Sequence, residues 1–146
     1  MKGKAIEPIE RLEDKESAAL GSGASTRTWR HKFADAWRGV KLGVRGQSSF
    51  FVHFFVAAAA LTAAWVMSLD WVSWCLVILC IGTVLAAEMF NSALEALCRG
   101  LDERSRSRCA PALDIAAGAV LITAGTAAIV GAIIFINRLA QMLHWW

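Results

Sequence analysis

The chain has 146 residues, of which 57% are hydrophobic, and its formal net charge at pH 7 is +3. This composition excludes an ordinary water-soluble domain of the same length and favours one compact membrane domain with a short polar extension. The charge is unevenly placed, because residues 1–50 hold ten of the fifteen Lys and Arg and residues 99–108 hold four more. Beside apolar segments, such clusters favour topology signals and contacts with anionic lipid over binding to nucleic acid.

Two segments precede the first long apolar stretch. Residues 1–28 are charged and then small and polar, which predicts a flexible extension to which we assign no function. In residues 29–46 large apolar side chains recur at i, i+4, i+7 and i+11, with basic residues mostly off that stripe: Phe33, Trp37, Val40 and Val44. This pattern predicts a basic amphipathic helix lying on a membrane surface, and a helix packed against protein is the alternative.

Three apolar segments follow, at about residues 50–69, 71–97 and 112–136. Each approaches or exceeds the roughly 20 residues that a helix needs to cross a bilayer. Asp70 marks a tight turn between the first two, where tryptophans cluster as they do at membrane interfaces. We therefore predict an all-α membrane protein with one surface helix and three transmembrane helices.

Basic residues predict the orientation of these helices. The N-terminal region and the segment 99–111 are basic, whereas the turn at Asp70 contains no Lys or Arg. The positive-inside rule therefore places the N-terminus and the basic loop in the cytoplasm. In the third segment, Gly118, Gly125 and Ala132 have heptad spacing, which lets helices approach closely in lipid. Three spans shield buried polar groups poorly, so we expect a homo-oligomer.

The four cysteines form no recognisable metal or disulfide framework. They include no CxxC pair and no neighbouring histidine: Cys75, Cys80, Cys98 and Cys109. Neither a zinc site nor a structural disulfide is predicted, and we interpret these residues as small apolar side chains.

A polar stripe interrupts the second apolar segment. Glu88, Asn91 and Glu95 are spaced i, i+3, i+7, which places them on one helical face. Ionisable groups are costly in hydrocarbon and therefore indicate function by default. Their hard oxygen ligands suit Mg²⁺ and phosphate chemistry. The structural alternative is that the two carboxylates only form interhelical hydrogen bonds within an oligomer.

The stripe belongs to a longer pattern, Glu88-x-x-Asn91-Ser92-Ala93-Leu94-Glu95, then a basic segment, then Leu113-Asp114-Ile115-Ala116-Ala117-Gly118-Ala119-Val120-Leu121. Over about residues 30–136 the chain resembles the prokaryotic diacylglycerol kinase/undecaprenol kinase family of small trimeric membrane enzymes. The resemblance implies a homotrimer in the bacterial inner membrane. It also implies ATP-dependent phosphorylation of a lipid alcohol, diacylglycerol or undecaprenol.

The resemblance also assigns roles to individual residues. Glu88 matches the proposed catalytic base, and Asn91 matches an amide that supports the same face. Glu95 matches a carboxylate that holds the Mg²⁺ bridging the ATP phosphates. Asp114 matches an acidic residue at the nucleotide site. Gln47 stands where the family usually has an acidic metal ligand, and its carbonyl oxygen is expected to take that place.

Three further positions depart from the family pattern, one of them Phe51, where the family commonly has Arg. Arg99 stands where the family usually has Asp, and Leu113 stands where it usually has Lys. Cations of the basic segment, Arg104 and Arg106 among them, are expected to neutralise the phosphates in place of that Lys.

Other interpretations remain open from the sequence. The basic segment could serve topology alone, and Asp114 could be an ordinary acidic residue in the first turn of a helix that starts at Pro111. His53 is predicted to be interfacial and not catalytic. As a whole, the protein could be a degenerate homologue that binds lipid or nucleotide without turnover. It could also be a small ion-conducting subunit that uses the carboxylate stripe for cations.

Overall fold

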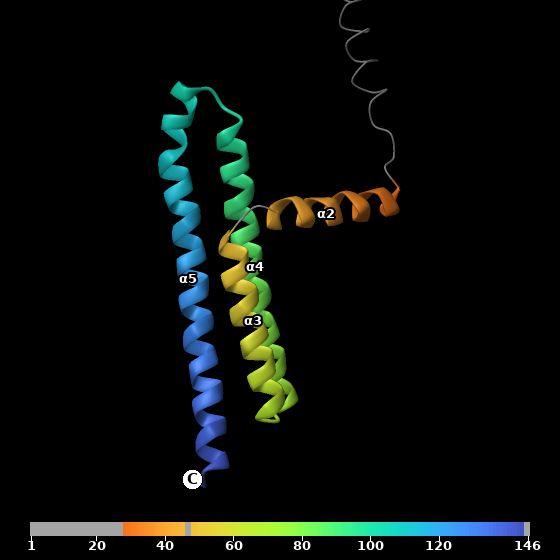
Figure 1. Ribbon diagram of the computed structural model, residues 1–146, viewed down its shortest axis with the longest axis vertical. Coiled ribbons are helices and arrows are strands. Elements are labelled where there is room, and N and C mark those ends of the chain that lie inside the picture. The colour runs from red at the N-terminus through yellow and green to blue at the C-terminus, as the bar shows by residue number, and fades with distance from the viewer. Residues whose placement is uncertain (1–27, 46–47, 145–146) are drawn as a thin grey trace, which may run out of the picture. The chain divides into compact units, whose positions relative to one another are not determined.

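The computed structural model describes residues 28–45 and 48–144. The predicted extension up to residue 27, and the predicted metal ligand Gln47, lie outside these residues. The chain divides into two compact units, Met1–Gly39 and Val40–Trp146. Regular structure in the described part is entirely helical, in the order α2, α3, α4 and α5 (Figure 1).

Helix α2 (Trp29–Val44) crosses the boundary between the units and has no buried residues. Its polar groups pair locally: Lys32 Nζ lies 4.7 Å from the Trp29 ring centre, and Arg38 donates to Asp35 over 2.6 Å. Phe33 and Trp37 of the predicted apolar stripe are exposed. An uncovered apolar stripe is what a membrane surface would cover, and that contact stays a prediction.

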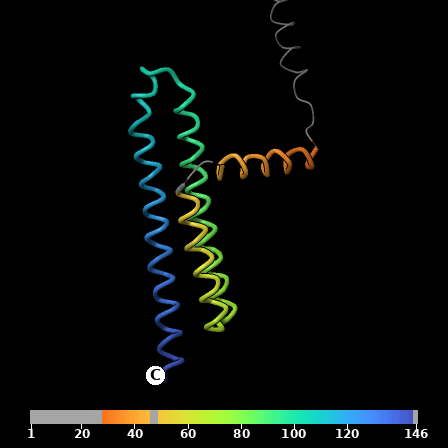
Figure 2. The backbone as a smooth tube through the Cα atoms, in the orientation of Figure 1, coloured from red at the N-terminus to blue at the C-terminus, as the bar shows by residue number. Residues whose placement is uncertain are grey.

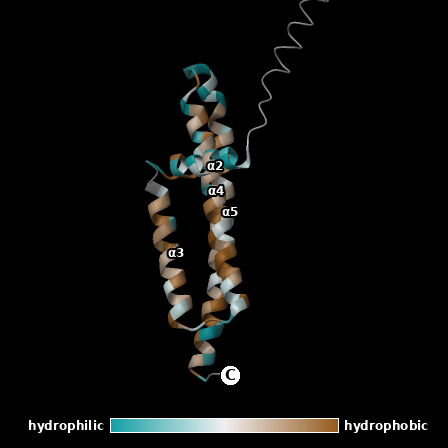
Figure 3. Ribbon diagram, turned by 90° about the vertical axis from the view of Figure 1, so that its right-hand side faces the viewer, coloured by the Kyte–Doolittle hydropathy of each residue, from teal (hydrophilic) through white to brown (hydrophobic). Residues whose placement is uncertain are grey.

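The second unit contains three long helices, α3 (Ser48–Val66), α4 (Trp71–Arg99) and α5 (Glu103–Met142). Each is long and apolar enough to cross a bilayer, which confirms the predicted architecture of three spanning-length helices. Helices α4 and α5 run antiparallel in close contact, and α3 lies along α4 (Figures 1 and 2). Figure 3 shows that the bodies of these helices are mostly apolar, as lipid contact requires.

The turn between α3 and α4 follows from its hydrogen bonds. Ser68 has a φ of 50°, and its N–H donates to the Trp65 carbonyl over 3.0 Å. The next N–H, of Leu69, donates to the Ala64 carbonyl over 3.1 Å, which completes a Schellman motif. Asp70 then caps the first turn of α4. The predicted tight turn at Asp70 is therefore confirmed.

This end of the bundle also holds an apolar cluster. Leu69 packs with the buried residues Ala64 and Val77, and side chains of all three helices surround them. Arg138 of α5 donates its Nε proton to the Met67 carbonyl over 2.8 Å. The turn is thus fixed to α5 as well as to its own helices.

The sequence predicts a loop over residues 99–111, and the structure differs from this prediction. The turn is short, and α5 begins at Glu103 because the Asp102 side chain accepts the Ser105 N–H over 3.3 Å as an N-cap. Pro111 lies inside the helix, where its exposed position limits the cost of the missing backbone donor. The helix thus starts before the apolar segment predicted at about 112–136, and Asp114 lies about three turns into α5, so the alternative that placed it in the first turn was wrong.

The cap at Asp70 predicts a pH-dependent contribution to stability. The Ser73 hydroxyl, with the Ser73 and Val72 N–H groups, holds the pKa of Asp70 below its ordinary value of 3.8. A lowered folded-state pKa gives stability that is present above pH 3.8 and is lost as pH falls through the folded value. Asp70→Asn keeps an acceptor oxygen that does not titrate.

We expect the parent to have a higher melting temperature than Asp70→Asn at neutral pH, and this difference to shrink in acid. Asp70→Ala should melt lower than Asp70→Asn at every pH, because it also loses the acceptor. Thermal unfolding in detergent, followed by circular dichroism, measures both effects. If the difference in melting temperature between the parent and Asp70→Asn stays constant with pH, this account is contradicted.

Candidate active site

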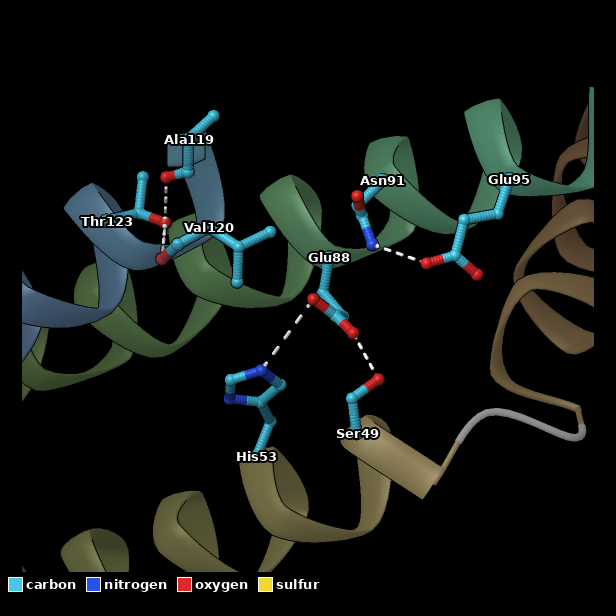
Figure 4. Close-up of polar contacts among 8 residues, drawn as sticks. All are labelled: Ser49, His53, Glu88, Asn91, Glu95, Ala119, Val120 and Thr123. Atoms are coloured by element: carbon cyan, nitrogen blue, oxygen red, sulfur yellow. Dashed lines mark hydrogen bonds and ion pairs between the residues drawn. The ribbon is translucent and has the colours of Figure 1, made fainter. Parts of the chain in front are cut away.

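A buried carboxylate lies at the centre of the polar stripe. Glu88 on α4 is only 3% exposed. The Ser49 hydroxyl donates to its Oε1 atom, and the His53 Nε2 atom lies 3.8 Å from its Oε2 atom, within ion-pair distance (Figure 4). Both partners come from the first turns of α3. On α5, the Thr123 hydroxyl donates to carbonyls of its own helix. The carboxylate is thus held from α3.

Sequence analysis did not find these two partners. It assigned His53 to the membrane interface and gave Ser49 no role. Their four-residue spacing on α3 was the available signal, because it places both on one helical face. The spacing does not show which helix that face meets, and Glu88 is 39 residues from Ser49 in the chain.

The second half of the stripe is more open. Asn91 donates from Nδ2 to the Glu95 Oε1 atom over 3.1 Å (Figure 4). Arg99 approaches the other oxygen of Glu95, with Nη1 3.4 Å from Oε2. The Glu95 side chain is 33% exposed. The stripe therefore runs from a buried carboxylate to an accessible one whose orientation is fixed by an amide.

A polar cavity of about 350 Å³ lies between α4 and α5, and it collects most of the predicted nucleotide-site residues. Its lining consists of Asn91, Glu95, Cys98, Arg99, Arg106, Leu113, Asp114 and Ala117. Arg104 is not among them, although the sequence had paired it with Arg106. Carboxylates and guanidinium groups around one cavity suit a phosphate–metal complex, because both signs of charge must be matched there.

An apolar groove of about 470 Å³ lies among α3, α4 and α5. Its lining includes Val52, Val56 and Ala57 from α3 and small or branched residues from the other two helices. His53 and Val84 also line it, and Val84 lies one turn before Glu88 on α4. Asn91, about one turn after Glu88, lines the polar cavity. Along α4, Glu88 therefore lies between a residue that lines the apolar groove and one that lines the polar cavity.

Ser92 is a second buried polar residue on α4 that sequence analysis left without a role. It is 3% exposed, and its hydroxyl has no hydrogen-bond partner among the described residues. A buried polar group that the fold leaves unsatisfied needs an explanation, and function is one of the common ones.

The donor set fits magnesium only in part. Among the described residues, no group of three His, Cys, Asp or Glu side chains gathers as a metal centre. Glu95 and Asp114 line the same cavity. One or two carboxylates are the usual protein contribution to Mg²⁺ that takes its other ligands from substrate phosphates and water. The cavity therefore fits a metal that arrives with a nucleotide better than a resident ion.

Comparison with known proteins finds relatives that are named as lipid kinases. The chain matches an undecaprenol kinase of Bacillus subtilis with 30% identity over 107 residues, which is 73% of this chain and 87% of that protein. It matches a diacylglycerol kinase of Synechocystis with 33% identity over 112 residues, 76% of this chain and 64% of that protein. The chain thus spans less than two thirds of the second relative. No solved structure matches.

The family comparison covers both the stripe and the cavity. The model of the family described as prokaryotic diacylglycerol kinase matches residues 34–135. This range contains the motif from Glu88 to Glu95, its α3 partners, and the α5 residues that line the polar cavity. With three helices of spanning length, the chain is a membrane protein. It belongs to the prokaryotic diacylglycerol kinase family.

Proposed function

We propose that this protein transfers the γ-phosphoryl group of ATP to the hydroxyl of a membrane lipid alcohol, diacylglycerol or undecaprenol. The observation that carries the proposal is the position of Glu88, a buried carboxylate that lies along α4 between a residue lining an apolar groove and one lining a polar cavity. A lipid kinase needs this combination, because its two substrates differ completely in polarity. The names of the two relatives, an undecaprenol kinase and a diacylglycerol kinase, support the same class of reaction.

The lipid half of the reaction uses Glu88 as a general base. The hydrocarbon chain occupies the apolar groove, which brings the hydroxyl to the level of His53 and Glu88. Glu88 accepts the hydroxyl proton as the lipid oxygen bonds to the γ-phosphorus. The bond from that phosphorus to the bridging oxygen breaks, and ADP leaves. Phosphoryl transfer depends mainly on position and charge neutralisation, so little further covalent chemistry is required.

The nucleotide half uses the polar cavity. Glu95 and Asp114 would hold Mg²⁺ brought by ATP, and Asn91 fixes the orientation of Glu95 through its 3.1 Å hydrogen bond. Bound Mg²⁺ neutralises charge on the phosphates. We assign Gln47 a carbonyl contact to the metal, by its position in the family motif. Arg106 lines the cavity near Leu113 and would take the part of the family's Lys.

The assembly and location are also part of the proposal. Glu88 and Ser92 are buried on α4, yet most large apolar side chains of α3, α4 and α5 remain exposed. A homotrimer in the bacterial inner membrane would cover part of this surface with other copies and the rest with lipid. The N-terminus and the turn between α4 and α5 would face the cytoplasm, where ATP is available.

One observation favours a second candidate, a family member that binds lipid or nucleotide without turnover. Arg99 Nη1 lies 3.4 Å from Glu95 Oε2 and competes with a metal for that carboxylate. The two functions differ in whether labelled phosphate moves from ATP to lipid.

Removing the base tests the lipid kinase directly. Glu88→Gln keeps the shape of the side chain but cannot accept a proton as a carboxylate does. We expect lipid phosphorylation to fall about 10²–10⁴-fold, the usual contribution of a general base. Glu103→Gln, which removes a carboxylate from the exposed start of α5, is the matched control and should leave turnover unchanged. Near-parental activity in Glu88→Gln would remove Glu88 from this role.

A magnesium titration tests Glu95. Glu95→Gln loses a charged oxygen ligand, so half-maximal activity should require several-fold more Mg²⁺ than in the parent. The same Glu103→Gln variant again controls for the lost charge. If the titration curves of Glu95→Gln and the parent superimpose, Glu95 does not bind the metal.

Two neighbouring arginines offer a matched pair for the phosphate-neutralising cation. Arg106 lines the polar cavity, whereas Arg104 does not. We expect Arg106→Gln to raise the KM for ATP or lower kcat about tenfold or more, because a guanidinium contact with phosphate is lost. Arg104→Gln should stay close to the parent. If Arg106→Gln and Arg104→Gln lose equal activity, the effect comes from the overall basic charge of this part of α5 and not from a specific contact of Arg106 with phosphate.

A further inference from the structure

We propose that His53 is a positioning residue that orients the carboxylate of Glu88 toward the lipid hydroxyl. This inference rests on the proposed function, because it assigns His53 a part in the same reaction. It starts from one contact between helices, in which His53 Nε2 on α3 lies 3.8 Å from Glu88 Oε2 on α4. That distance is longer than a hydrogen bond, so His53 acts on Glu88 by the place that its polar ring edge takes beside Oε2.

The two oxygens of Glu88 are held by different residues of α3. Ser49 donates to Oε1, and His53 faces Oε2 (Figure 4). Because Ser49 and His53 are one helical turn apart, the carboxylate lies across a single turn of α3. A glutamate side chain has three rotatable bonds, and two contacts from one rigid helix restrict them. Each oxygen has a further lone pair, so the group held in this way can still accept a proton.

The surroundings of the imidazole restrict its partners. His53 lines the apolar groove, where α4 contributes the Cys80 thiol and α5 contributes only apolar side chains and glycine. No Asp, Glu, Lys or Arg of the described residues lines this groove, and the carboxylate that lies 3.8 Å from the ring belongs to Glu88. The same ring therefore contacts both the space assigned to the lipid chain and the base. The His53 ring therefore lies where a hydrocarbon chain in the groove would approach the Glu88 carboxylate.

A role in packing alone and a role in positioning predict different kinetics. If His53 only fills the groove, His53→Leu should retain kcat and alter at most the KM for lipid. If His53 orients Glu88, the variant should lose kcat, because misplacement of a catalytic group affects the transition state more than substrate binding. His53→Gln keeps an N–H donor near the same place and should restore much of the loss.

The kinetic test compares parent, His53→Leu and His53→Gln with purified protein in lipid nanodiscs. We expect His53→Leu to lower kcat about 10- to 100-fold with less than about a twofold change in the KM for lipid. His53→Gln should recover at least a third of the parental kcat. Val56→Ala, one turn further along the groove, is the matched control and should affect only KM. An unchanged kcat in His53→Leu would overturn the proposal. Equal losses of kcat in His53→Leu and His53→Gln would overturn it as well.

A spectroscopic test does not depend on activity. The chain has three histidines, His31, His53 and His144, so ring-labelled protein gives few signals. We expect Glu88→Gln to shift the His53 ring resonances while the other two stay in place, and Glu95→Gln to leave all three unchanged. A His53 signal that does not respond to Glu88→Gln overturns the proposal. If neither lipid is phosphorylated by the parent, the proposed function fails, and this measurement still decides whether the His53–Glu88 pairing exists.

Discussion

The buried carboxylate of Glu88 is the constraint on which the rest of the structure depends. A glutamate that is 3% exposed in an apolar bundle is costly unless polar groups reach it. The fold supplies them by bringing the first turns of α3 against the middle of α4. Along α4, this contact lies between Val84, which lines the apolar groove, and Asn91, which lines the polar cavity. Burial of the carboxylate, its partners and its place between these two residues are thus one arrangement.

The sequence was sufficient for features that depend on local pattern. Spanning-length apolar segments, the turn at Asp70 and the face shared by Glu88, Asn91 and Glu95 all follow from hydropathy and helical spacing. It was insufficient where distant residues meet. Ser49 reaches Glu88 across 39 residues, and no spacing rule identifies such a pair. The family resemblance proposed Glu88 as the base but did not identify the residues that hold it.

The start of α5 shows how one local error affects the site. The sequence predicts a loop over 99–111, whereas the N-cap at Asp102 begins the helix at Glu103. In a loop, Arg104 and Arg106 are equivalent sources of positive charge. In a helix, residues two apart point about 200° from each other. Only Arg106 of this pair lines the polar cavity, beside Leu113. Arg106 and Leu113 are about two turns apart on α5, so the proposal that Arg106 replaces the family's Lys depends on this helical spacing.

The central claim is that the two spaces beside Glu88 hold a lipid alcohol and a nucleotide that react with each other. The most direct measurement incubates purified protein with γ-labelled ATP, Mg²⁺ and nanodiscs that contain either diacylglycerol or undecaprenol, and then extracts the lipids. The account predicts labelled lipid phosphate with at least one of the two alcohols, and none when both are left out. Label that remains in the aqueous phase with both alcohols, while ATP still binds, would contradict it and favour a binding protein without turnover.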